Sequence, residues 1–153
     1  MKKNLLFAGI SACLLLLNSC SGDDNKSNGS NNNSATTVSF KINGVAKTLN
    51  TATVTARPPE ADGDVILTAV ATDGAGTSFD FGVYKGRLGS QGSATFNING
   101  TLYNGSRDGE FGNYIMYFTQ SDDHHLKGTF SGPVGTSTGN IAVITDGVFN
   151  INY

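Results

Sequence analysis

Residues 37–49 read TVSFKINGVAKTL. Val38, Phe40 and Ile42 alternate with polar residues, and Asn43-Gly44 separates this run from a second short one. Alternation of this kind is typical of a strand with one buried face. Asn-Gly between two such runs is the strongest short-range hairpin signal, because both turn residues must adopt positive φ. The stretch therefore predicts two antiparallel strands joined by a two-residue turn.

The same pattern recurs throughout residues 37–153, with turn dipeptides that include Asp62-Gly63, Asp73-Gly74 and Asn99-Gly100. About nine or ten short strands result, at roughly 8–12-residue spacing, as in sandwiches and barrels. No spacer is long enough for the crossover that parallel strands need. The sequence therefore predicts an all-β fold, an antiparallel meander that forms a sandwich or flattened barrel.

Several segments carry more specific expectations. Residues 114–119 are apolar on both faces, which predicts an interior strand covered on both sides. Residues 86–93 and 132–140 are glycine-rich and are predicted to be loops. The chain is expected to end in two strands that turn around Asp146-Gly147.

The first residues have the pattern of a secretory leader. Lys2 and Lys3 precede an apolar run, Leu5 to Leu17, which is too short to span a bilayer as a helix. Cys20 follows shortly after this run. Three parts are predicted: a leader at 1–19, Cys20 with a polar tether at 20–36, and a β domain at 37–153. The tether has no large apolar side chain, so nothing offsets the entropy of ordering it.

The segment Leu17-Asn18-Ser19-Cys20 resembles the lipobox of bacterial lipoproteins, although Asn18 departs from the usual small or aliphatic residue. This resemblance implies that Cys20 receives a diacylglycerol thioether and that the leader is cut before it. Ser21 after the cysteine resembles the sorting pattern for the outer membrane, and Asp23-Asp24 resembles the acidic export signal of surface lipoproteins in the Bacteroidota. These resemblances imply a protein of the outer membrane, held by lipid and facing outside.

The end of the chain supports the same location. Gly128-Thr129-Phe130 and the closing stretch 144–153 resemble the last strands of small uncharacterised lipoproteins of the Bacteroidota. In these, a β domain of similar size follows a lipidated cysteine. The resemblance implies architecture and location, and it supplies no catalytic residue.

Composition excludes several classes of function. The formal net charge is −2, whereas a nucleic-acid partner needs a clustered basic surface. Both cysteines, Cys13 and Cys20, lie in the first 20 residues, which argues against a disulfide scaffold or a thiol enzyme. Trp is absent, so the G-x-W fingerprint of lipocalin-like carriers is missing.

One cluster in the sequence has metal-ligand residue types, Asp122-Asp123-His124-His125. Adjacent histidines in a strand point to opposite faces, so a polar hairpin tip is favoured over a metal site. The spacing of Gly86, Gly89 and Gly92 looks like a phosphate cradle, but a strand follows it instead of the helix that such a cradle needs. Lys85 and Arg87 nearby are interpreted as solvated edge charges.

Carboxylates flank glycines where turns are predicted, which is a poor place for a catalytic pair: Asp62, Asp64, Asp108 and Glu110. Core and cross-strand packing is favoured over sugar stacking for the five tyrosines: Tyr84, Tyr103, Tyr114, Tyr117 and Tyr153. We therefore expect no enzyme activity, no cofactor and no metal. The favoured function is a binding or interaction module for a glycan, protein or small molecule. The alternatives are a small-ligand carrier with an interior cavity and, less favoured, a glycan-acting hydrolase.

Overall fold

The structure, a computed structural model, describes residues 35–59 and 61–153. The predicted leader, Cys20 and nearly all of the tether lie outside the described residues. The described part contains eleven strands and no helix, and hence no helix long and apolar enough to cross a membrane. The strands are β1 (Thr37–Ile42), β2 (Val45–Leu49), β3 (Thr51–Ala56), β4 (Ile66–Thr72), β5 (Thr77–Tyr84), β6 (Gly89–Ser90), β7 (Ser93–Ile98), β8 (Thr101–Ser106), β9 (Ile115–Ser121), β10 (His125–Gly135) and β11 (Ile141–Asn152).

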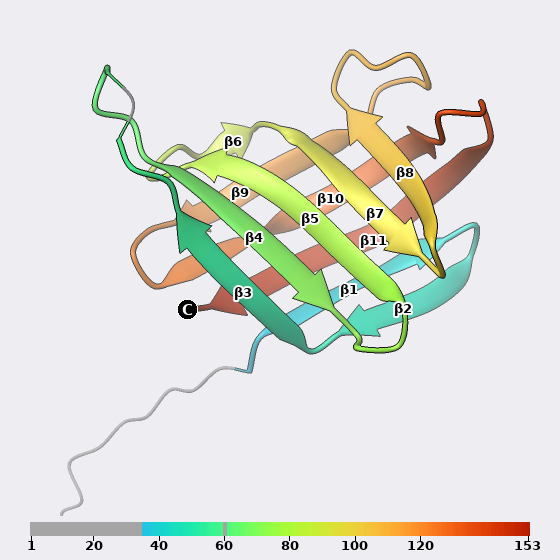
Figure 1. The fold of residues 1–153 in the computed structure, drawn as a ribbon, viewed down its shortest axis with the longest axis horizontal. Helices are drawn as coiled ribbons and strands as arrows, with labels where there is room; N and C mark the ends of the chain where they lie inside the picture. Colours follow the sequence, from blue (N-terminus) through green and yellow to red (C-terminus); the bar gives the residue numbers. More distant parts are fainter. Residues whose placement is uncertain (1–34, 60) are drawn as a thin grey trace, which may run out of the picture. The chain divides into compact units, whose positions relative to one another are not determined.

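All the strands belong to one antiparallel sheet that folds over into two layers (Figure 1). The first layer has the order β8-β7-β5-β4-β3. The second has the order β2-β1-β11-β10, with β9 paired to β10. The predicted all-β, antiparallel fold is confirmed.

The two layers are joined so that the sheet nearly closes into a barrel-like shape. Gly135 of β10 pairs with Asn104 of β8 on one side. On the other side β6 pairs with β9, and the Gly86 N–H donates to the Ser121 carbonyl oxygen over 2.9 Å. The sheet is open between β2 and β3, the two ends of the strand order.

The predicted Asn-Gly hairpins are confirmed. Asn43 and Gly44 have φ of 48° and 81° between β1 and β2, where Ile42 pairs with Val45. Asn99 and Gly100 have φ of 52° and 86° between β7 and β8. Positive φ at both positions gives the turn a twist that matches the flanking strands.

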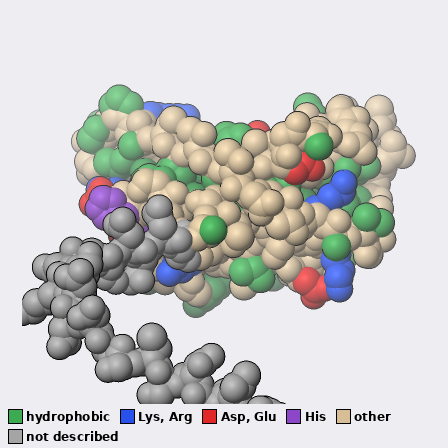
Figure 2. All heavy atoms as spheres, turned by 90° about the horizontal axis from the view of Figure 1, so that it is seen from below, with side chains coloured by type: hydrophobic (Ala, Val, Ile, Leu, Met, Phe, Trp, Pro, Cys, Tyr) green, Lys and Arg blue, Asp and Glu red, His purple; other side chains and the backbone are tan. Residues whose placement is uncertain are grey.

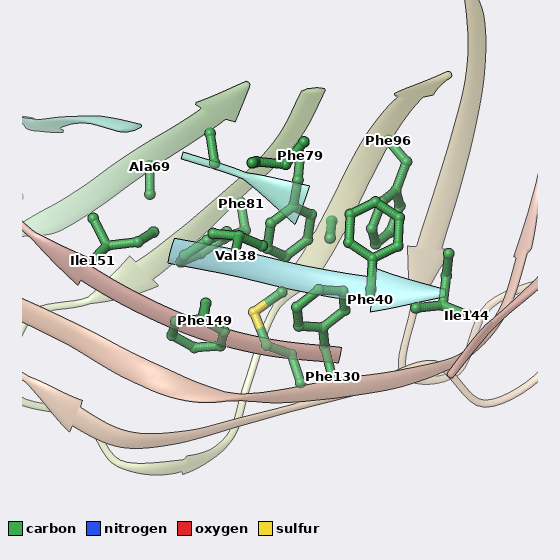
Figure 3. Packing of buried hydrophobic residues seen from close by; sticks show 14 of the residues in the cluster. Val38, Phe40, Ala69, Phe79, Phe81, Phe96, Phe130, Ile144, Phe149 and Ile151 are labelled. Atoms are coloured by element: carbon green, nitrogen blue, oxygen red, sulfur yellow. The ribbon is translucent and has the colours of Figure 1, made fainter. Parts of the chain in front are cut away.

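Alternate side chains of both layers point inward and form an aromatic core (Figure 3). The Phe130 ring lies 4.4 Å from Phe79 of the first layer and 5.7 Å from Phe40 of the second, measured between ring centroids. Phe79 also stacks on Phe96 at 4.8 Å. These rings hold the two layers together, because they bury large apolar areas from both sides.

Glycines opposite phenylalanines make this core possible. In the β10–β11 pairing, Gly128 faces Phe149 and Phe130 faces Gly147. A Cβ at Gly128 would overlap the Tyr117 carbonyl oxygen and lie 2.5 Å from Cζ of Phe149. A Cβ at Gly147 would lie 2.6 Å from Cδ2 of Phe130. Each ring therefore occupies the space that a side chain on the opposite strand would need.

The prediction of two terminal strands around Asp146-Gly147 is wrong, because β11 runs continuously from Ile141 to Asn152. Asp146 has a φ of 53° and its carboxylate pairs with Lys41 Nζ over 2.9 Å. The pairings of β11 with β1 and with β10 both shift register near this point. The dipeptide therefore forms a bulge, which inserts a residue without reversing the chain.

The strand at 114–119 is not covered on both faces. In β9, Ile115 and Tyr117 are 42% and 50% exposed, because the folded sheet gives each layer only one inner face. The predicted loops also differ: 86–93 contains β6, and β10 continues through Gly135. Pro133 lies where β10 changes neighbour from β9 to β8.

Candidate binding site

Cys20, the predicted lipid-attachment residue, lies outside the described residues. The described chain enters the sheet at Thr36, whose hydroxyl donates to the Asn152 carbonyl oxygen over 3.2 Å and accepts from the Asn152 N–H over 3.1 Å. The Tyr153 N–H in turn donates to the His124 carbonyl oxygen over 3.0 Å. The chain therefore enters the domain beside the end of its last strand and near the turn at 122–124.

The cluster at 122–125 forms a capped turn. Asp122 Oδ1 accepts from the backbone N–H groups of His124 and His125 over 2.9 and 2.8 Å, and Oδ2 accepts from Gln120 Nε2 over 2.6 Å. These hydrogen bonds, chiefly the one from Gln120, lower the pKa of Asp122 to about 2. Asp123 pairs with Lys85.

The two histidine rings lie 6.4 Å apart at the tip of this turn, at one end of the domain beside acidic side chains (Figure 2). Both oxygens of the Asp122 carboxylate already accept hydrogen bonds from Gln120, His124 and His125. Among residues 35–59 and 61–153, no group of three or more His, Cys, Asp or Glu side chains could hold a metal ion.

The four carboxylates singled out in the sequence lie on two different loops. Asp62 Oδ1 accepts from the Asp64 N–H over 3.1 Å between β3 and β4. Asp108 and Glu110 lie in the loop after β8. These loops follow β3 and β8, which lie at opposite ends of the first layer, so the two sets are not brought together into the facing pair that a glycosidase needs.

The glycine-rich segment after β5 crosses from the first layer to the second. Gly86, Gly89 and Gly92 have φ of 79°, 88° and 79°, which favour glycine. The Gln91 N–H donates to the Met116 carbonyl oxygen over 3.0 Å, next to the β6–β9 pairing. Beside this segment, the pairing of β5 with β7 ends at Phe81 and Ala94.

This crossing leaves a groove of about 540 Å³ beside the last residues of β5. That volume lies in the range of small-molecule sites. Leu88 and Tyr84, which line it, are 60% and 37% exposed. A Cβ at Gly82 would come no closer than 3.9 Å to Ile66 or Leu67, so a larger side chain could enter the groove here without a clash at its Cβ. Among the described residues, those that line the groove are Ile66, Gly82, Val83, Tyr84, Arg87, Leu88, Gln91 and Gly92.

The charges at the groove are paired within the protein. The guanidinium of Arg87 lies over the Tyr84 ring, with Cζ 4.3 Å from the ring centroid, and its Nη2 lies 2.5 Å from Asp64 Oδ2. Gln91 Nε2 donates over a long 3.4 Å to the Leu88 carbonyl oxygen. The groove thus combines an apolar floor with a planar amide and a neutralised ion pair at its rim.

The tyrosines do not form one exposed surface. Tyr114 is buried in the core, where burial raises the pKa of its hydroxyl well above the usual value. Tyr117 is exposed on the outside of the second layer, and Tyr153 donates to the Asp122 carbonyl oxygen at the end turn. Among the five, Tyr84 lines the groove.

The centre between the layers is filled with packed aromatic rings. Neighbouring centroids there lie 4.4 to 6.5 Å apart, as in the pairs Phe79–Phe130 and Phe40–Phe79 (Figure 3). A carrier would need that space for its ligand. The packing therefore gives no support to the alternative of an interior ligand cavity.

The groove is not predicted by the sequence. Arg87 is expected to be a solvated edge charge, whereas in the structure it stacks on Tyr84 and pairs with Asp64. One signal was present: Gly82 stands at an outward position of an otherwise alternating strand, and such a glycine often marks the approach of a ligand or another backbone. No sequence pattern indicates that Ile66 and Leu88 line a groove.

Comparison of the chain with protein-family models, with curated proteins and with solved structures finds no match.

Proposed function

We propose that the protein is a lipid-anchored lipoprotein of the outer membrane, facing outside, whose β domain is a non-enzymatic binding module. The groove beside Tyr84 carries the binding part of this proposal, because it combines an open apolar floor with polar groups at its rim. The lipobox at Leu17 to Cys20 supports the anchor.

The anchor follows from the chemistry of the cysteine. A thiolate is a better nucleophile toward a lipid donor than a hydroxyl. Acyl chains contribute about 0.8 kcal/mol per buried CH₂, so two or three chains make a stable attachment where one is marginal. In this proposal the residues between Cys20 and the first strand serve as a spacer, because they include no large apolar side chain.

Metabolic labelling with a fatty acid tests the anchor, and the chain offers a matched control. Cys20→Ala should abolish labelling and release the protein from the membrane fraction. Cys13→Ala removes the other cysteine, which the proposal assigns to the cleaved leader, and should label like wild type. Equal labelling of wild type and Cys20→Ala would reject the anchor.

Protease treatment of intact cells tests the orientation. Wild type should be degraded from outside, while a periplasmic protein is protected. Replacing Asp23 and Asp24 with Asn should reduce this accessibility if the acidic pair directs export. Full protection of the wild-type protein in intact cells would reject surface exposure.

A further inference from the structure

The outer face of the first layer is rich in hydrogen-bonding side chains. In β3, β4, β5, β7 and β8, most inward residues are apolar and most outward ones carry hydroxyl or amide groups, with Val70 and Leu102 exposed among them. We call this the threonine face: Thr51, Thr53, Thr55, Thr68, Thr72, Ser78, Asp80, Thr95, Asn97 and Asn104.

The register places these side chains in rows across the layer. Thr53 faces Val70, and Val70 faces Asp80. Asp80 faces Thr95, which faces Asn104. Residues opposite each other in a sheet lie within about 5.5 Å. In this row, Asp80, Thr95 and Asn104 therefore present closely spaced hydrogen-bonding groups, beside the exposed apolar side chain of Val70.

The threonine face carries almost no charge. Among all the residues of its five strands, Asp80 is the one charged side chain, and there is no Lys or Arg. The second layer, in contrast, has Lys41, Lys47 and Lys127 in its strands. A polymer of phosphates, sulfates or carboxylates needs cations to offset its charge. The threonine face therefore fits a neutral partner.

The groove is continuous with the threonine face. Gly82, which lines the groove, faces Thr68, and Thr68 faces Thr55. Arg87 is already paired with Asp64, so the groove also has no net charge to match. Its apolar lining and the Gln91 amide fit a ring with one C–H face and hydroxyl groups at its edge.

We propose that the groove and the threonine face together bind a neutral polysaccharide, with one sugar ring against Gly82 and Leu88 and the chain continuing over Thr55 and Thr53. This inference rests on the proposed function as a binding module and names its ligand class. A sugar chain matches both parts of the site, because its rings have apolar faces and its hydroxyl groups can exchange hydrogen bonds with Thr, Ser and Asn.

The test uses the full-length lipoprotein in a detergent without a sugar headgroup. Affinity electrophoresis through gels that contain starch, mannan or galactan supplies neutral probes, and polygalacturonate supplies the acidic counterpart. We expect retardation by at least one neutral polymer and none by polygalacturonate.

Two variants locate the site. Gly82→Val fills the groove floor where a Cβ meets only ordinary contacts, and should weaken binding by about tenfold or more, as a few misplaced carbons do in a pocket. Thr53→Lys places a cation on the threonine face at edge strand β3 and should also weaken binding. Thr48→Lys is its matched control, since Thr48 is exposed on the other edge strand, β2, and should bind like wild type. Circular dichroism confirms that each variant is folded.

Different results would reject the ligand class and the binding site. Retardation by polygalacturonate, or by none of the neutral polymers, overturns the ligand class. Binding of a neutral polymer that survives both Gly82→Val and Thr53→Lys overturns the site. The ligand class and site can fail in these ways while Cys20 labelling and surface exposure stand, so the two proposals are tested separately.

Discussion

Two glycines in similar strand positions should respond oppositely to the same substitution. Gly128 and Gly82 both lie inside strands and neither has a positive φ. A Cβ at Gly82 would meet its nearest neighbours at 3.9 Å, whereas one at Gly128 would overlap the Tyr117 carbonyl oxygen and lie 2.5 Å from Phe149 Cζ. Alanine in place of a strand glycine stabilises by about 0.5–1 kcal/mol when it fits, because it restricts the unfolded chain.

Gly82→Ala should therefore raise the free energy of unfolding by about 0.5–1 kcal/mol. Gly128→Ala should lower it by about 1–3 kcal/mol, the usual cost of forcing extra carbon into a packed core. The two variants should thus differ by about 1.5–4 kcal/mol.

Urea unfolding followed by far-ultraviolet circular dichroism measures this difference, and it suits a chain without Trp. The slope of unfolding free energy against urea should stay unchanged, which would show that the variants differ in stability and not in the surface exposed on unfolding. If Gly128→Ala were as stable as Gly82→Ala, the packing of Phe149 over Gly128 would be wrong.

Three further changes probe the core and the pH response. Phe130→Ala should cost about 3–5 kcal/mol in urea unfolding, because this ring packs against both layers, and a loss near zero would contradict the central position of the ring. Burial raises the pKa of Asp80, so its ionised form disfavours folding. Asp80→Asn should therefore have a higher melting temperature than wild type at pH 7. The difference should vanish below pH 3.8, where the carboxyl group is protonated in both the folded and the unfolded state. The pKa of Asp122 is lowered to about 2, so wild type should lose stability as pH falls from 3.8 toward that value, whereas Asp122→Asn should show a flatter acid profile in the same melts.

The hairpins were predictable because their signals are local. Asn43-Gly44 and Asn99-Gly100 require positive φ at both residues, and the strands on either side pair with each other directly. Asp146-Gly147 carries a similar signal and forms a bulge instead. The difference lies in β1 and β10, which pair with β11 on both sides of Asp146 and keep the strand continuous.

The groove, too, is only partly predictable from local sequence. Its glycines and charged residues predict a loop with edge charges. The groove itself depends on where β7 stops pairing with β5, and on the crossing that brings Gln91 to Met116 of β9. Ile66 lines the groove because it pairs with Tyr84 between β4 and β5. These contacts are set by long-range pairing, which has no local sequence pattern.

By itself the sequence determined the class of fold, the alternation that selects the core, the two Asn-Gly turns and the expectation of a lipid anchor at Cys20. Tertiary structure alone decided that the sheet folds into two layers around Phe130, that Gly128 and Gly147 lie under rings, and that Tyr84 and Leu88 share a groove. The physical reason is that alternation and turn chemistry act between neighbours in the chain. Strand order and layer contacts depend instead on which distant strands pair, and many pairings satisfy the same local pattern.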